Sequence, residues 1–349
     1  REIRRGDIHT ESHYYRCMEH RLVTALLIIV CLGGCAAVTG RPIEPPARNS
    51  QMVEPEVLEQ LPSTLSIPHF SKMRLSGTGL TLESVLEKNS AYTRYAISYL
   101  SNGLRISGIL NIPDGGGPFP LVIFNHGFID TSVYVRGRGL RREQDYVARQ
   151  GFAVLHTDYR GHAASDLSPM VEKVYDGALE YAMDAANAGA AVRGAPLPSV
   201  DTTKVGMLGH SLGGGVTLAI LTGRHDLVSA AVLYAPVHAD VWENFERWRS
   251  RREEGDRTRE VYGTKEENPE FWSKLSPETF LDRIQAPILL FHGDQDSDVP
   301  KSWSDHLFSR LQSLGKSIEY VEYSGEGHEF GPEWNDFMRK TSEFFKKNL

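Results

Sequence analysis

The stretch Gly209-His210-Ser211-Leu212-Gly213 constrains the fold more than any other feature of the chain. Residues 204–208 before it read as a short buried strand, and residues 213–222 after it are small and aliphatic, as in a packed helix. A strand that turns directly into a helix leaves a serine on a strained corner with its hydroxyl above the sheet. Flanking glycines let the backbone crowd that corner without Cβ clashes. We therefore predict a nucleophilic serine at position 211; the alternative is a glycine-rich turn with an incidental serine.

Strand and helix patterns alternate along most of the chain. Two alternating segments, residues 93–100 and 104–112, flank Asn102-Gly103, which predicts a two-residue hairpin turn. Apolar runs predict further strands at residues 120–125, 152–157, 205–208, 228–234, 288–291 and 318–323. Helical patterns cover residues 141–150, 170–192, 302–314 and 333–347. An opening antiparallel hairpin followed by this alternation predicts an α/β fold, a mostly parallel sheet with helices on both faces.

Residues 238–284 interrupt the alternation. Trp242, Phe245 and Trp248 follow one another at helical spacing among many charged residues. We predict a helical insertion over the carboxyl edge of the sheet, where ligands bind in such folds. Two interpretations stay open: a cap that shapes a substrate pocket, or an excursion whose aromatic side chains only dock it onto the body.

Composition excludes several classes of function. The chain has 349 residues, of which 40% are hydrophobic and 24% charged, enough for one large α/β domain with a sizeable core. The net charge of −7 gives no basic footprint, so we expect no nucleic-acid partner. No Cys/His spacing typical of zinc sites and no phosphate-binding glycine loop occurs, so we predict no metal and no cofactor.

The N-terminal region contains a short apolar segment, residues 22–32, directly after Arg21. This arrangement is typical of a signal peptide and is shorter than the ~20 residues of a membrane-spanning helix. The segment ends in Leu32-Gly33-Gly34-Cys35, which resembles the lipobox of bacterial lipoproteins. The resemblance implies cleavage before Cys35 and lipidation of its sulfur. A plain cleaved signal and an N-terminal hydrophobic anchor are the alternatives.

These features predict the organisation of the chain. Residues 1–17 are an upstream segment without a predicted function, 18–34 the signal peptide, 35–66 a proline-rich tether, and 67–349 one folded domain that includes the insertion. The cysteines stand at positions 17, 31 and 35, so the folded part is predicted to hold no disulfide. We expect a location in the bacterial cell envelope, lipid-anchored and outside the cytoplasm, or secretion if the lipobox is not used. The oligomeric state stays open.

A serine nucleophile needs a base and a group that orients the base. In a fold of this kind the acid follows the serine in the chain and the histidine comes last. Gly325-Glu326-Gly327-His328 follows the last predicted strand and supplies the base, His328. The loop after residues 288–291 carries Asp294, Asp296 and Asp298, any of which suits the acid on residue type alone.

Together these motifs resemble the α/β-hydrolase superfamily, and most closely the catalytic domain of the prolyl oligopeptidase (peptidase S9) group and its esterase relatives. The resemblance covers about residues 93–348. Its HG-x-x-D-x-x-V-P pattern, here residues 292–300, puts Asp296 in the acid position and leaves Asp294 and Asp298 as loop acids. It implies a Ser211, His328 and Asp296 triad, with His292 and His210 as structural residues.

The oxyanion of an acyl-transfer reaction also needs hydrogen-bond donors. The backbone N–H of Leu212 is one predicted donor. Asn125-His126-Gly127-Phe128 resembles the HG-x oxyanion loop of the superfamily, which implies the N–H of Phe128 as the second donor and a structural role for His126. Residues 158–162 resemble the superfamily's D-x-R-G segment, in which Arg160 is expected to pair with a carboxylate. A substrate contact by Tyr159 or His162 is the alternative.

The resemblance departs from the peptidases at two motifs. His126-Gly127-Phe128 stands where those peptidases often have Tyr-Gly-Gly, and His210 and Leu212 stand where an aromatic residue often flanks the serine. The chain ahead of residue 93 is also too short for a β-propeller. We therefore expect a serine hydrolase that acts on small carboxylic esters, with hydrolysis of short peptides as the alternative. A non-catalytic binding module and an acyltransferase on the same fold are further alternatives.

Overall fold

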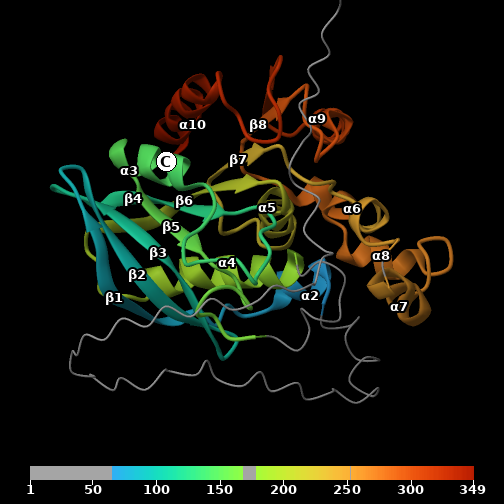
Figure 1. Ribbon diagram of the computed structural model, residues 1–349, viewed down its shortest axis with the longest axis horizontal. Helices are drawn as coiled ribbons and strands as arrows, with labels where there is room; N and C mark the ends of the chain where they lie inside the picture. Colours follow the sequence, from blue (N-terminus) through green and yellow to red (C-terminus); the bar gives the residue numbers. More distant parts are fainter. Residues whose placement is uncertain (1–64, 168–177, 252) are drawn as a thin grey trace, which may run out of the picture. The chain divides into compact units, whose positions relative to one another are not determined.

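The computed structural model describes residues 65–167, 178–251 and 253–349. A nine-stranded sheet forms its centre, in the order β1-β2-β3-β5-β4-β6-β7-β8-β9 (Figure 1). The first three strands and the β3–β5 pair are antiparallel, whereas all pairs from β5 to β9 are parallel. The strands are β1 (Thr78–Lys88), β2 (Tyr92–Ser101), β3 (Leu104–Pro113), β4 (Phe119–Asn125), β5 (Ala153–Thr157), β6 (Val200–His210), β7 (Ala230–Tyr234), β8 (Ile288–Gly293) and β9 (Ile318–Tyr323).

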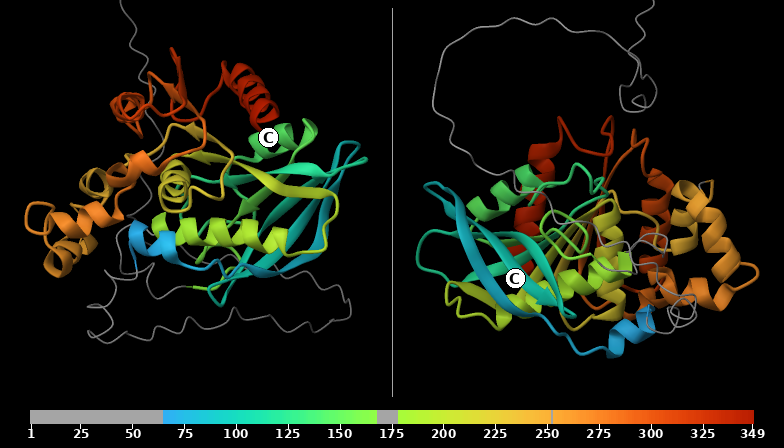
Figure 2. Two further views of the ribbon diagram at one scale, coloured as in Figure 1. Left: turned by 180° about the vertical axis from the view of Figure 1, so that it is seen from behind. Right: turned by 60° about the horizontal axis from the view of Figure 1, so that its bottom comes forward.

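Helices cover both faces of this sheet. On one face lie α3 and α10, and on the other lie α4 and α5, as the views in Figure 2 show. The α/β-hydrolase architecture predicted from the sequence is thereby confirmed. The helices are α2 (Ile67–Lys72), α3 (Arg141–Arg149), α4 (Ala178–Arg193), α5 (Leu212–Gly223), α6 (Val241–Trp248), α7 (Glu253–Tyr262), α8 (Pro269–Leu275), the 3-10 helix η1 (Pro277–Arg283), α9 (Lys301–Ser313) and α10 (Trp334–Asn348).

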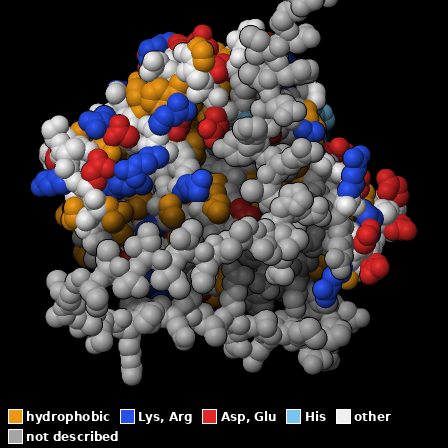
Figure 3. Space-filling view, viewed as in Figure 1, with side chains coloured by type: hydrophobic (Ala, Val, Ile, Leu, Met, Phe, Trp, Pro, Cys, Tyr) orange, Lys and Arg blue, Asp and Glu red, His pale blue; other side chains and the backbone are white. Residues whose placement is uncertain are grey.

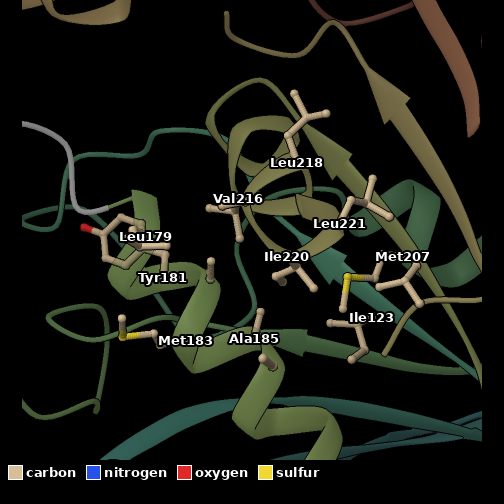
Figure 4. Close-up of a cluster of buried hydrophobic side chains, with 14 of the residues drawn as sticks. Ile123, Leu179, Tyr181, Met183, Ala185, Met207, Val216, Leu218, Ile220 and Leu221 are labelled. Atoms are coloured by element: carbon tan, nitrogen blue, oxygen red, sulfur yellow. The ribbon is translucent and has the colours of Figure 1, made fainter. Parts of the chain in front are cut away.

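The central strands are buried on both faces, which explains their continuous apolar runs. In β4, Leu121 and Ile123 join the core under α4 and α5, whereas Val122 and Phe124 join the core under α3 and α10. Figure 4 shows the first of these cores, in which side chains from α4 and α5 meet Ile123 of β4 and Met207 of β6. This packing holds β6 and α5, the two elements on either side of Ser211, in fixed positions.

The predicted hairpin is present, and two elements were missed. Asn102 and Gly103 both have positive φ, 49° and 84°, as a two-residue turn between β2 and β3 requires. The edge strand β1 gave no strand signal because its apolar side chains are largely exposed, Val85 at 57% among them. The short helix α2 was also missed, and Leu65 and Ser66, at the end of the predicted tether, are already buried.

The predicted insertion folds as α6, α7, α8 and η1. Phe245 and Trp272 are fully buried, so aromatic side chains do dock the segment onto the body. Helix α8 packs against α2, and η1 packs against α5 and α9, on the flank of the sheet. At the carboxyl edge of the sheet, where the insertion was expected, Arg247 near the end of α6 contacts the loop after β8.

The surface seen in Figure 3 carries charges of both signs. Lys, Arg, Asp and Glu side chains are interspersed on the upper left of that face, the part formed by α3 and α10. No helix in the described part of the chain is long and apolar enough to cross a membrane. The signal peptide, Cys35 and the first part of the predicted helix at residues 170–192 lie outside the described residues.

Candidate active site

Ser211 lies at the sharp corner between β6 and α5. Its φ of 55° and ψ of −121° are strained for a residue with a side chain. The backbone holds this conformation from two sides, because Ser211 N–H donates to the Tyr234 carbonyl (3.0 Å) and the Ser211 carbonyl accepts from Val237 N–H (3.1 Å). Within the described part of the chain, the Ser211 hydroxyl forms no hydrogen bond. The hydroxyl is thus presented as an available nucleophile.

The glycines around this corner are required by close backbone contacts. A Cβ atom on Gly209 would lie 2.2 Å from the carbonyl oxygen of Gly213. A Cβ atom on Gly213 would lie 1.9 Å from the carbonyl oxygen of Asn125, at the end of β4. Side chains at either position would push α5 away from the sheet, so the Gly-x-Ser-x-Gly spacing follows from packing.

Asp296 and His328 lie in adjacent loops and form a hydrogen bond of 2.7 Å between Oδ2 and Nδ1. Because Nδ1–H donates to a carboxylate, Nε2 is the nitrogen left free to accept a proton. Burial raises the pKa of Asp296, but hydrogen bonds from His292 and His328 outweigh this effect and hold the pKa well below its usual range. Asp296 is therefore a carboxylate at neutral pH and can stabilise an imidazolium at His328.

The three aspartates of this loop have different contacts. Asp296 Oδ1 accepts from the N–H groups of Asp298 (2.9 Å) and Val299 (2.8 Å), which leaves Oδ2 for His328. Asp294 Oδ1 instead accepts from Gly325 N–H (2.7 Å) and fixes the start of the histidine loop. Asp298 is exposed. Of these carboxylates, the one in contact with His328 is that of Asp296.

His292 and His210 have structural contacts. His292 is fully buried; its Nδ1 bonds the hydroxyl of Ser304 (2.7 Å), its Nε2–H donates to the Val299 carbonyl (3.1 Å), and Nε2 also lies 3.2 Å from Asp296 Oδ2. His210 Nε2–H donates to the His328 carbonyl (2.9 Å), and the two imidazole rings lie 4.6 Å apart. Since His210 directly precedes Ser211, this contact places the histidine loop beside the serine. The structure thus brings Asp296 into contact with His328 and places the loop that carries His328 beside Ser211.

The loop after β4 lies against the serine corner. A Cβ atom on Gly127 would lie 3.1 Å from Cβ of Ser211. His126 Nδ1–H donates to the Gly127 carbonyl (2.7 Å), and the opposite end of that planar peptide is the N–H of Phe128. In the described part of the chain, neither Phe128 N–H nor Leu212 N–H donates a hydrogen bond. Both predicted oxyanion donors are therefore free, and His126 has the structural role expected of it.

The segment after β5 packs against the loop after β4. Arg160 is buried and bonds two buried carboxylates, Glu180 (2.6 Å) and Asp184 (2.8 Å). The rings of His126 and Tyr159 stack with centroids 4.4 Å apart, and His162 lies at the edge of the same cluster. Tyr159 is fully buried and His162 nearly so, at 4% exposure. The structural interpretation of this segment is therefore favoured over a substrate contact.

Sequence reasoning missed two residues that hold the histidine loop. The Tyr234 hydroxyl accepts from Phe330 N–H, and its ring lies 4.3 Å from that of His210. The buried Glu326 carboxylate accepts from the N–H groups of Gly331 (2.8 Å) and Glu333 (2.6 Å), just before α10. The sequence did offer a signal for Glu326, which is an acid between the two glycines that precede His328. It offered no such signal for Tyr234.

Three buried histidines near the site predict loss of stability in acid. Burial lowers the pKa of His126 and of His210 to about 3 and lowers that of His156 well below its ordinary value of 6.5. Below pH 6.5 the unfolded chain binds protons at these positions and the folded protein does not. Each histidine then costs about 1.4 kcal/mol of unfolding free energy per pH unit until its folded-state pKa is reached.

We therefore expect a lower urea midpoint at pH 5 than at pH 7.5. His156→Leu should reduce this difference, because leucine does not titrate. The ring nitrogens of His156 have no hydrogen-bond partner in the described structure, so the substitution breaks no hydrogen bond there. His69→Gln, at an exposed residue, is the matched control and should leave the difference unchanged. Equal midpoints at the two pH values would contradict this account of the buried histidines.

No group of His, Cys, Asp and Glu side chains within the described residues is arranged to hold a metal ion. The arrangement that is present can carry out acyl transfer: a serine hydroxyl without a hydrogen bond in the described structure, an imidazole oriented by a carboxylate, and two N–H groups without acceptors there.

Comparison with known proteins gives one family and a set of related folds. The model of the prolyl oligopeptidase family matches residues 138–349. The uncharacterized peptidase YtmA of Bacillus subtilis (strain 168) is 31% identical over 256 residues, which cover 72% of this chain and 93% of YtmA.

Among solved structures, acylaminoacyl peptidase from Pyrococcus horikoshii has a TM-score of 0.61 at 21% identity, covering 75% of this chain and 42% of that one. Acetyl xylan esterase 1 from Thermoanaerobacterium sp. JW/SL YS485 has a TM-score of 0.59 at 20% identity, covering 83% of this chain and 94% of that one. At such identities the structural matches establish the shared fold. The chain thus spans nearly all of YtmA and less than half of the acylaminoacyl peptidase.

Proposed function

The chain belongs to the prolyl oligopeptidase family and is a serine hydrolase, and we propose that it cleaves carboxylic esters with Ser211, His328 and Asp296 as its catalytic triad. The 2.7 Å hydrogen bond between Asp296 and His328, in a loop held beside Ser211, is the observation that carries this proposal. A catalytic role replaces the alternative of a binding module, because the family is one of hydrolases and the groups needed for chemistry are all present.

The first half of the proposed reaction forms an acyl-enzyme. His328 Nε2 takes the proton of the Ser211 hydroxyl as Oγ attacks the ester carbonyl. The N–H groups of Leu212 and Phe128 donate to the oxyanion that develops on the carbonyl oxygen. His328 then passes its proton to the departing alkoxide, which leaves as an alcohol. Asp296 keeps the imidazole in the required tautomer and stabilises its cation throughout.

The second half returns the free enzyme. Water attacks the acyl-enzyme carbonyl while His328 Nε2 accepts a water proton, and the same two N–H groups hold the second oxyanion. Collapse breaks the bond to Ser211 Oγ, which recovers its proton from His328, and the carboxylic acid leaves. All groups in this cycle are side chains or backbone atoms of the chain, so the proposal needs no cofactor.

An ester is the less demanding substrate class for this site, because an alkoxide can leave more easily than the amide anion of a peptide, whose nitrogen must be protonated before it departs. Phe128, whose side chain belongs to the oxyanion loop, is 69% exposed and offers an apolar wall to the acyl group. Hydrolysis of short peptides is the second candidate. It is favoured by the family match and by the likeness to YtmA, which is described as a peptidase.

A substrate panel separates these candidates. Nitrophenyl esters of increasing acyl length are compared with aminoacyl and prolyl nitroanilides on the purified enzyme. The ester proposal predicts a higher kcat/KM for the esters after each rate is divided by the rate of spontaneous hydrolysis of the same substrate. A higher corrected kcat/KM for the anilides would assign the enzyme to the peptidases.

We also propose that the enzyme is a lipoprotein of the bacterial cell envelope, attached through Cys35. The support is the sequence alone: an apolar segment of signal-peptide length that ends in Leu-Gly-Gly-Cys. Expressed from Met18 in a bacterial host, the protein should incorporate labelled palmitate and sediment with membranes. Cys35→Ala should remove the label. Equal labelling of the variant would contradict attachment at this cysteine.

A further inference from the structure

We propose that Arg247, on helix α6 of the insertion, is a positioning residue for the catalytic acid Asp296. The inference rests on the proposed function, in which Asp296 orients His328. The proposal gives the insertion a role in catalysis. The two interpretations drawn from the sequence made it either a cap over the substrate or a segment that only docks onto the body.

Arg247 and Asp296 bind opposite ends of the same two peptide groups. Nη2 of Arg247 donates to the carbonyl of Ser297 (3.1 Å), and Nε donates to the carbonyl of Asp298 (2.9 Å). The N–H groups of the same two peptides, those of Asp298 and Val299, donate to Asp296 Oδ1 at 2.9 and 2.8 Å. Two peptide groups therefore stand between the guanidinium and the carboxylate, bonded at both ends.

The two peptide groups fix the position of the Asp296 carboxylate. The positive charge of Arg247 polarises the N–H groups that donate to it. In a planar trans peptide the C=O and N–H point in opposite directions, so a cation at the oxygen strengthens the donor at the nitrogen. With Oδ1 held by two such donors, Oδ2 is the oxygen left to face His328 Nδ1. Loss of Arg247 would leave both carbonyls without these bonds and would weaken the hold on the acid loop, in which His292 still contacts Asp296 Oδ2 (3.2 Å).

Aromatic side chains hold Arg247 in this position. Its guanidinium lies over the rings of Trp248 and Trp303, at 5.6 and 5.7 Å from their centroids. The two indoles meet edge to face, 5.5 Å apart, and Trp303 stands on α9 close after the acid loop. The planar guanidinium can lie against the rings while two of its N–H groups donate in a fixed geometry, whereas a lysine ammonium is a compact charge without such a plane. The position of α6 thus controls the geometry of the acid loop.

Arg247→Met tests this proposal, with Arg257→Met on α7 as the control. Arg247 and Arg257 are both exposed arginines of the same insertion, so each variant removes one positive charge from the surface, and of the two it is Arg247 that bonds the acid loop. We expect Arg247→Met to lower kcat by about 10- to 100-fold with little change in KM, and to weaken or remove the downfield proton resonance of His328 Nδ1–H. Arg247→Lys should recover part of kcat. Arg257→Met should match the wild type in both measurements.

A double-mutant cycle with Asp296→Asn gives the decisive comparison. If Arg247 acts through Asp296, Arg247→Met should cause no further loss of kcat in the Asp296→Asn enzyme. An equal loss in both backgrounds, or wild-type kcat and resonance in Arg247→Met, would overturn the inference and leave the triad intact. Should Arg247→Met fail to fold, the same cycle is run with Arg247→Lys. Wild-type activity in Asp296→Asn itself would instead overturn the proposed function.

Discussion

Replacement of Ser211 by alanine is expected to lower kcat by about four orders of magnitude or more while the melting temperature stays near that of the wild type. The change removes the nucleophilic oxygen and nothing that the fold uses, since the Ser211 hydroxyl forms no hydrogen bond in the described structure. The measurement is steady-state hydrolysis of a nitrophenyl ester together with thermal unfolding.

The control for this prediction is Ser309→Ala, at an exposed serine on α9. It should keep both the wild-type turnover and the wild-type melting temperature. Turnover retained by Ser211→Ala, in protein freed of host esterases, would show that another group is the nucleophile.

Replacement of Asp296 by asparagine is expected to lower kcat by about 10³- to 10⁴-fold. Asparagine keeps an oxygen for the N–H groups of the loop but can offer its amide N–H to His328 Nδ1. The imidazole would then carry its proton on Nε2 and could not accept the proton of Ser211. Hydrolysis rates at saturating ester, with unfolding curves to confirm the fold, measure the effect.

Asp298→Asn makes the same chemical change two residues away, on an exposed side chain of the same loop. Its turnover should stay within about twofold of the wild type, because surface substitutions of this kind have small effects. A comparable loss in both variants would mean that the charge of the loop matters and not the contact between Asp296 and His328.

Local sequence signals were sufficient for most of the fold. Asn102 and Gly103 both adopt positive φ, and few other residue pairs do so readily, so the hairpin could be predicted from two letters. The central strands are buried on both faces, and their uninterrupted apolar runs therefore identified them. Strand β1 pairs at the edge and exposes its apolar residues, so its pattern carried no burial signal.

The parts of the site that could be predicted are those for which the reaction requires a particular sequence motif. The corner at Ser211 needs glycines to avoid backbone clashes, and the acid and the base must follow later strands of the same edge. The choice of Asp296 among three neighbouring aspartates came from the family pattern, and the loop geometry now supplies a physical reason for it.

The supporting contacts could not be predicted in the same way. Tyr234, His210 and Arg247 act on residues tens of positions away in the chain, and each contact depends on how packed elements meet. Arg247 stands in a run of mixed charges that reads as an ordinary solvent-exposed helix face. Its partners are backbone carbonyls, which leave no mark in a sequence.

The central claim is that Ser211 is the residue that becomes acylated. The most direct measurement is to react the enzyme with a fluorophosphonate, digest it and locate the adduct by mass spectrometry. We predict a single adduct on Ser211, absent from Ser211→Ala and strongly slowed in His328→Ala. An adduct on a different residue, or no adduct in an enzyme that hydrolyses esters, would contradict the account.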